Sequence, residues 1–243
     1  MRLSVSGTSC LGKSTFVHDF LEEWPMYTAP DISYRELLSE KGLPHSKATN
    51  EDTQWAILNC MIDEIQKYDK DSKVIFDRCP LDNLVYTMYA YSRDNVSSEF
   101  VNKCIPLVRE SIKSFDIMFF VPVTKVSPVE IEDDGTREID PDYNTEIDHL
   151  FKAMKYDWDC NHESKIFDPR DKPAMIEIFG SPLERIQMAK LYLNVDGDII
   201  DNTGILTEEE IRQAENLKQQ FGIETDSTLE ILDDPKGKNV KYK

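Results

Sequence analysis

The feature that most constrains this chain is a glycine-rich stretch at its amino end. Residues 7–14 read Gly-Thr-Ser-Cys-Leu-Gly-Lys-Ser and fit G-x-x-x-x-G-K-[ST] at every required position. The stretch directly follows the short apolar run 3–6 and precedes a segment whose apolar residues recur at helical spacing. A glycine-rich turn between a strand and a helix is the setting of a phosphate-binding loop. The sequence therefore predicts an α/β chain that binds nucleotide phosphates.

The residue types in this loop have chemical reasons. The glycines let successive backbone N–H groups curve around phosphate oxygens. Lys13 is expected to reach the β and γ phosphates, and Ser14 to offer its hydroxyl to Mg²⁺. The helix that begins near Lys13 adds the positive end of its dipole. The residues expected to bind the nucleotide are Gly7, Thr8, Ser9, Cys10, Leu11, Gly12, Lys13, Ser14 and Thr15.

Strand-sized and helical apolar patterns alternate along most of the chain. Strands are predicted over residues 2–6, 26–29, 73–78, 116–123 and 174–179. Helices are predicted over residues 13–23, about 50–68, 80 to about 91, 98–114, 144–158 and 183–191, with a short one ending near Gly42. Strands separated by helices predict a parallel sheet with helices on both faces, the three-layer α/β sandwich of P-loop NTPases.

Two parts of the chain interrupt this alternation. Residues 124–143 are strongly acidic around the run 135–137, which predicts a lid-like insertion. Residues 193–243 are predicted to form a C-terminal extension, with a capped helix from Thr207 to Phe221 and a polar tail. The predicted division is therefore a catalytic domain over 1–192 and an extension over 193–243.

The charge balance limits the partners of the chain. Its 28 Lys and Arg residues against 46 Asp and Glu residues give a formal net charge of -18. Nonspecific binding to nucleic acid or anionic membranes is thereby disfavoured, while a local basic channel stays open. Apolar runs are strand-sized, so no transmembrane or secretory segment is expected. Five scattered cysteines without a C-x-x-C pair favour a reducing cytoplasm, and Cys160 with His162 lacks the second close pair of a zinc site.

Two charges at the end of the predicted strand 73–78 are further candidates. A carboxylate at the carboxyl end of a buried strand in such a protein faces the phosphate loop, where Asp77 is expected to bind Mg²⁺ or accept a proton. Arg78 beside it is expected to neutralise a phosphoryl group. The structural alternative for the pair is a strand-end ion pair or a helix cap. Both are predicted to be catalytic residues together with Lys13.

Four more charged residues are candidates by their position. Arg137 in the lid is expected to stabilise charge on the transferred group, or else to be a solvated arginine among carboxylates. Arg185 follows the last strand and either lies near the adenine or pairs at the surface. Asp31 and Arg35 lie beyond a strand end, where acceptor substrates bind in such sheets, and can equally be a cap and a surface charge.

These motifs together resemble those of small P-loop kinases. The resemblance rests on residues 7–15, on the run Phe-Asp-Arg-Cys-Pro-Leu-Asp-Asn-Leu-Val-Tyr at 76–86, and on Asp-Asp-Gly-Thr-Arg at 133–137. The chain is similar, over approximately residues 1–190, to the group that contains the nicotinamide riboside kinase domain and related viral nucleoside or nucleotide kinases. The resemblance implies ATP and Mg²⁺ as cofactors, contacted by Lys13 and Ser14. It also implies Asp77 as general base or metal-organising carboxylate, and Arg137 as lid arginine.

Two departures from the family pattern leave the acceptor open. Cys79 stands where deoxynucleoside kinases usually have a serine after the strand-end arginine, and the region around Asp31 lacks their glutamate-proline pair. The resemblance implies a nucleoside- or nucleotide-like acceptor. Some viral relatives are thought to phosphorylate a hydroxymethylated pyrimidine within DNA, and this acceptor stays open although the acidic balance disfavours it.

The favoured function is an ATP-dependent kinase that works by positioning and charge stabilisation. The first alternative is a nucleotide switch or GTPase. Guanine-specific proteins commonly carry Asn-Lys-x-Asp after a strand, whereas residues 124–127 read Thr-Lys-Val-Ser and lack the carboxylate. The second alternative is an ATPase module of a larger assembly, which the short chain and the lid-like insert disfavour. The sequence does not specify the oligomeric state.

Overall fold

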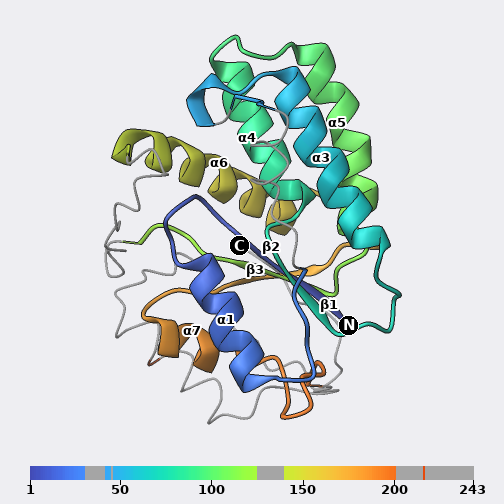
Figure 1. Ribbon diagram of the computed structural model, residues 1–243, viewed down its shortest axis with the longest axis vertical. Coiled ribbons are helices and arrows are strands. Elements are labelled where there is room, and N and C mark those ends of the chain that lie inside the picture. The colour runs from blue at the N-terminus through green and yellow to red at the C-terminus, as the bar shows by residue number, and fades with distance from the viewer. Residues whose placement is uncertain (31–41, 45, 125–139, 201–215, 217–243) are drawn as a thin grey trace, which may run out of the picture. The chain divides into compact units, whose positions relative to one another are not determined.

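The computed structural model describes residues 1–30, 42–44, 46–124, 140–200 and 216 (Figure 1). The chain divides into two compact units, Met1–Ile200 and Asp201–Lys243, and the description below concerns the first. The predicted helix from Thr207 to Phe221, the short helix before Gly42 and nearly all of the predicted lid lie outside the described residues.

A parallel sheet forms the centre of this unit. In the described ranges its four strands run in the order β2-β1-β3-β4. They are β1 (Arg2–Ser6), β2 (Val74–Asp77), β3 (Ile117–Phe120) and β4 (Ala174–Glu177). Leu3 of β1 is in register with Ile75 of β2 and with Ile117 of β3. Each strand lies inside its predicted range, because continuous apolar runs are typical of strands buried on both faces.

The predicted strand over residues 26–29 is wrong. Only Thr28 pairs, as an isolated parallel bridge to Val74. Its N–H donates to the Lys73 carbonyl oxygen at 3.0 Å, and its own carbonyl accepts from Ile75 N at 2.9 Å. Pro30 follows within two residues and has no N–H to donate, so the ladder does not extend.

The helices mostly follow their predicted ranges. Asn50 caps α3 by accepting a hydrogen bond from Thr53 N at 2.9 Å. α6 begins at Pro141 rather than at 144, because the Asp140 side chain accepts from Tyr143 N at 2.9 Å and proline suits a first helical turn. Residues 141–143, predicted to be lid, are therefore helical. The described elements are α1 (Lys13–Glu23), the 3₁₀ turn η1 (Ser46–Ala48), α3 (Glu51–Gln66), α4 (Pro80–Ser92), α5 (Ser98–Ile112), α6 (Pro141–Cys160) and α7 (Pro182–Ala189).

Helices cover both faces of the sheet (Figure 1). α1 and α7 pack on one face around a core that includes Phe20 and Phe119. α3, α4, α5 and α6 pack on the other face, where Leu58, Leu84 and Phe151 are buried. This arrangement confirms the predicted three-layer sandwich. Among the described helices, none has the length and apolar character needed to span a bilayer.

Residues 193–200 pack against the end of α1. Trp24 Nε1 donates to the Asn194 carbonyl oxygen at 2.9 Å, and Tyr27 OH donates to the Gly197 carbonyl oxygen at 2.7 Å. These residues belong to the first compact unit, which ends at Ile200 rather than at 192. The assignment of a separate C-terminal extension stays a prediction.

Candidate nucleotide-binding site

The glycine-rich loop connects the carboxyl end of β1 to the first turn of α1. Gly7 has a φ of 142°, and a Cβ atom there would lie 2.6 Å from the Val121 carbonyl oxygen. Gly12 has a φ of 68° and is the N-cap of α1. Residues with side chains rarely adopt such φ values, so both positions favour glycine. At Gly7 the close approach to the Val121 backbone also requires it.

An open pocket lies beside this loop. Its lining combines the loop and first helical turn with the two charges that follow β2. The structure thus brings together residues that are more than sixty positions apart in the sequence but were predicted to share one site. The lining residues are Cys10, Leu11, Gly12, Lys13, Ser14, Thr15, Asp77 and Arg78.

Lys13 is buried in the loop itself. Its side chain is 5% exposed, and its ammonium donates to the Thr8 carbonyl oxygen. Burial lowers the pKa of Lys13 to about 7; the charge of Arg78 lowers it too, while Asp77 and Asp82 oppose the shift. Negative charge beside an ammonium favours its protonated form. A phosphate bound in the loop would therefore favour the protonated form of Lys13, which burial disfavours in the nucleotide-free protein.

Ser14 and Asp77 meet at the mouth of the pocket. The Ser14 hydroxyl donates to Asp77 Oδ2 at 2.5 Å, joining the first turn of α1 to the end of β2. Hydroxyl and carboxylate oxygens are hard donors of the kind that Mg²⁺ prefers, usually alongside nucleotide phosphates and water. The donor set of this pair therefore fits a magnesium ion bound to a nucleotide.

Arg78 lies under the loop, with 8% of its surface exposed. Its NH1 donates to the Gly7 carbonyl oxygen at 3.3 Å and to Asp82 Oδ1 at 3.1 Å. The guanidinium carbon lies 5.4 Å from the centroid of the Tyr86 ring. Arg78 thus lines the pocket while supporting the start of the loop.

Asp82 is a functional candidate that sequence reasoning missed. It is the third residue of α4, and its side chain reciprocally caps that helix by accepting from Cys79 N at 3.0 Å. It also accepts from the Ser6 hydroxyl at 2.7 Å and from Gly7 N at 3.3 Å. An acidic residue in the first turn of the predicted helix over residues 80 to about 91 was the available signal for a capping role. Only the fold shows that the same carboxylate reaches the glycine-rich loop.

Cys79, the departure from the kinase pattern, is the N-cap of α4. Its thiol is buried and lies 3.4 Å from the Ser6 hydroxyl oxygen. Burial raises the pKa of Cys79 to about 12, with a further contribution from Asp82. The thiol is therefore neutral at physiological pH and is a packing group rather than a nucleophile.

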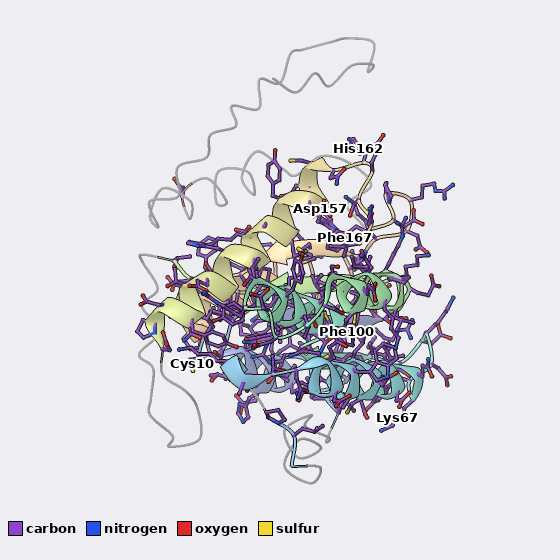
Figure 2. The ribbon with its side chains drawn as sticks, turned by 90° about the horizontal axis from the view of Figure 1, so that it is seen from above. Cys10, Lys67, Phe100, Asp157, His162 and Phe167 are labelled. Carbon is purple, nitrogen blue, oxygen red and sulfur yellow. The ribbon has the colours of Figure 1, made fainter. Side chains whose placement is uncertain are left out.

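α6 reaches the loop through its first turns. The Ser9 hydroxyl donates to Asn144 Oδ1 at 2.8 Å, and Asn144 is buried. Figure 2 shows Cys10 near the amino end of α6, with Asp157 and His162 at the opposite end of that helix. The element that follows the predicted lid is therefore attached directly to the phosphate-binding loop.

Arg185 reaches the loop from α7. Its NH1 donates to the Leu11 carbonyl oxygen at 2.6 Å, and 5% of its surface is exposed. Burial lowers the pKa of Arg185. Because the guanidinium is buried against the Leu11 carbonyl, Arg185 does not form an exposed surface pair. Its predicted place near the adenine stays a prediction. The remaining predicted residues, Asp31, Arg35 and Arg137, lie outside the described residues.

A buried polar cluster between α3 and α4 was also missed. Asn83 Nδ2 donates to Gln54 Oε1 at 2.7 Å, and Gln54 Nε2 donates to the Thr49 hydroxyl at 2.7 Å. The Thr87 hydroxyl donates to Gln54 Oε1 at 3.3 Å. Asn83 Oδ1 has no partner among the described residues. Polar residues on otherwise apolar helix faces were the available signal for this cluster.

Comparison with known proteins supports this fold. The sequence model of the AAA domain family matches residues 2–164. No curated protein matches the sequence. A structure of deoxyadenosine kinase from M. mycoides, with the products dCMP and a flexible dCDP bound, has a TM-score of 0.53 at 17% identity. That alignment covers 90% of this chain and 99% of the kinase.

The NadR protein is similar as well. Its complex with NAD and AMP-PNP has a TM-score of 0.55 at 12% identity, covering 84% of this chain and 51% of NadR. Its complex with NR has a TM-score of 0.50 at 14% identity, covering 93% and 52%. This chain therefore spans about half the length of NadR. At such identities the similarity shows a shared fold, which is P-loop NTPase-like.

Proposed function

Since this chain belongs to the AAA domain family, we propose that its pocket binds Mg-ATP and that it is a phosphotransferase. It would move the γ-phosphoryl group of ATP to a nucleoside- or nucleotide-like acceptor. The observation that carries this proposal is the contact between Ser14 and Asp77 at the mouth of a pocket built on the phosphate-binding loop. It supports the proposal because phosphoryl transfer uses a carboxylate beside the phosphate-binding loop, to bind Mg²⁺ or to accept a proton.

The residues of the loop have distinct roles in this proposal. The backbone N–H groups of residues 7–13 would bind phosphate oxygens, and the Lys13 ammonium would neutralise the β and γ phosphates. Ser14 and Asp77 would hold Mg²⁺, which when bound neutralises charge on the phosphates. Arg78 and Arg137 are proposed to stabilise the charge that develops on the transferred group.

Asp77 has two proposed roles that use the same position. It would accept a proton from the acceptor hydroxyl, or it would orient the metal ion, since both tasks require a carboxylate beside the terminal phosphate. Asp77 is exposed at the end of β2, so an acceptor hydroxyl has access to it. Asp31 and Arg35 remain the proposed acceptor-binding residues.

A small nucleoside-like acceptor is favoured over a polymer. Two structural neighbours were solved with small ligands of this class, namely deoxyadenosine kinase with dCMP and dCDP, and NadR with NR. The net charge of -18 opposes binding of a long polyanion. A hydroxymethylated pyrimidine in DNA is the less favoured acceptor, and it would need a local groove that overcomes this charge.

The family match favours one second function, an ATPase module that hydrolyses ATP without a small acceptor. Transfer of labelled γ-phosphate from Mg-ATP separates the two. The acceptors to compare are nucleosides, nucleoside monophosphates, nicotinamide riboside, and DNA with or without hydroxymethylated pyrimidines. Label on one acceptor, lost in Lys13→Ala, supports the phosphotransferase. Release of label only as free phosphate, with every acceptor present, supports the ATPase.

A further inference from the structure

A single buried carboxylate joins the two halves of the candidate site. Asp82 is 1% exposed and receives hydrogen bonds from four groups. Its Oδ2 accepts from the Ser6 hydroxyl at 2.7 Å and from Cys79 N at 3.0 Å. Its Oδ1 accepts from Arg78 NH1 at 3.1 Å and from Gly7 N at 3.3 Å.

The four donors belong to two neighbouring strand ends. Ser6 ends β1 and Gly7 opens the phosphate-binding loop, whereas Arg78 and Cys79 directly follow Asp77 of β2. Arg78 also joins the two ends directly: its N–H donates to the Val5 carbonyl oxygen at 3.0 Å, and its NH1 donates to the Gly7 carbonyl oxygen at 3.3 Å. The position of the loop relative to Asp77 therefore depends on how these two ends are held together.

Only a carboxylate suits the surroundings of Asp82. Two backbone N–H groups, a guanidinium and a hydroxyl all donate to it, and an ionised carboxylate is an acceptor at both oxygens. An asparagine in its place would present an NH₂ donor, instead of an acceptor oxygen, to two of these four donors. Its negative charge also compensates the buried Arg78 guanidinium, to which it is ion-paired.

We propose that Asp82 is a positioning residue for nucleotide binding. It holds the first glycine of the loop against the strand end that carries Asp77, and it does not itself contact the nucleotide. Because this inference rests on the proposed function, it is tested by nucleotide binding, which needs no acceptor. A purely structural carboxylate would affect the stability of the protein without a specific effect on the loop.

The test compares Asp82→Asn with Asp168→Asn by calorimetric titration with Mg-ATP. Asp168 is a matched control, since its side chain is 15% exposed and lies 3.7 Å from Arg109 NH2, outside the pocket lining. We expect Asp82→Asn to bind Mg-ATP at least tenfold more weakly, roughly the effect of one misplaced charge-assisted contact. Asp168→Asn should bind like the wild type.

Hydrogen exchange separates a local effect from a global one. In folded Asp82→Asn, amides of residues 7–12 should exchange faster while those of β3 keep their wild-type rates. If Asp82→Asn does not fold, Ser6→Ala decides the question, because it removes one donor to Asp82 and leaves the charge. Ser6→Ala should then weaken Mg-ATP binding by about threefold.

Three results would overturn the inference. The first is a wild-type affinity for Mg-ATP in folded Asp82→Asn. The second is an equal acceleration of hydrogen exchange in the loop and in β3 of that variant. The third applies if Asp82→Asn does not fold, and is a wild-type affinity for Mg-ATP in Ser6→Ala. Failure of the wild-type protein to bind Mg-ATP would instead contradict the proposed function, and the role of Asp82 with it. Binding by the wild type therefore distinguishes the two failures.

Discussion

The Ser14 hydroxyl lies 2.5 Å from Asp77 Oδ2, so the first turn of α1 is hydrogen-bonded directly to the end of β2. Asp77 lies in register with Val5 on β1, and the phosphate-binding loop begins two residues later at Gly7. The parallel pairing of these two strands thus brings a carboxylate to the loop. The proposed activity should therefore depend on the Asp77 carboxylate itself.

Replacing Asp77 by Asn should lower turnover by roughly 10²-fold or more, because the amide neither accepts a proton nor binds Mg²⁺ as a carboxylate does. The thermal midpoint should change little, since Asp77 is exposed. The measurements are initial rates at saturating substrates and a thermal melt. Asp71→Asn is the control, as an exposed aspartate before the other end of β2. Undiminished turnover in Asp77→Asn would remove Asp77 from the mechanism.

Lys13 should make the stability of the nucleotide-free protein depend on pH. Burial lowers its pKa from 10.5 to about 7, so between these values the unfolded chain holds a proton that the folded protein does not. Stability therefore rises with pH across this window, by at most about 1.4 kcal/mol per pH unit from this group. Below pH 7 both states are protonated and the cost of the buried charge is constant.

Lys13→Met isolates this effect. Its free energy of unfolding should exceed that of the wild type at pH 7, and the gap should narrow as the pH rises to 9, because the buried charge is lost from the folded wild type. Urea denaturation at several pH values measures the gap. A gap that is constant with pH would show that Lys13 keeps its ordinary pKa.

The bond between Ser9 and Asn144 should contribute to nucleotide binding. Asn144→Ala removes an acceptor 2.8 Å from the Ser9 hydroxyl, and loss of one such bond costs about 1 kcal/mol, or roughly fivefold in affinity. Calorimetric titration with Mg-ATP measures the change. Asn161→Ala, at the other end of α6, should bind normally. Equal affinities in both variants would show that α6 does not act on the loop.

Gly197→Ala should destabilise the fold more than Gly42→Ala. Both glycines have positive φ, 71° and 60°, so both substitutions carry a backbone cost of about 1 kcal/mol. A Cβ at Gly197 would lie 2.6 Å from Tyr27 Cε2, whereas no atom of the described residues lies within 4 Å of one at Gly42. Urea denaturation should give an extra loss of roughly 1–3 kcal/mol for Gly197→Ala. Equal losses would show that Tyr27 moves aside freely.

Local chemistry explains which parts of the fold the sequence predicts. The glycines of the loop and the capping residue Asn50 act on neighbouring backbone, and the apolar strands follow a short pattern, so each can be read from adjacent residues. The errors were local as well. Pro30 ends the pairing of the apolar run 26–29, and the Asp140-Pro141 pair starts a helix inside an acidic segment, so in both places a neighbouring residue overrides the composition.

Long-range contacts explain what the sequence does not predict. Asp82 reaches Ser6 across 76 positions, and Arg185 reaches Leu11 across 174. No periodicity relates such residues, because their contact depends on which strands become neighbours and on how each helix packs. The loop and Asp77 were predictable from motif and strand position, whereas the residues that support them required the assembled sheet.

The most direct test of phosphoryl transfer is the stoichiometry of the reaction in the presence of the acceptor that becomes labelled. ADP and phosphorylated acceptor are quantified together over one time course, for the wild type and for Lys13→Ala. We predict one ADP for each phosphorylated acceptor, with both products lost in the variant. ADP formed at an equal rate without any acceptor, and matched by free phosphate, would contradict the proposal that this chain is a phosphotransferase.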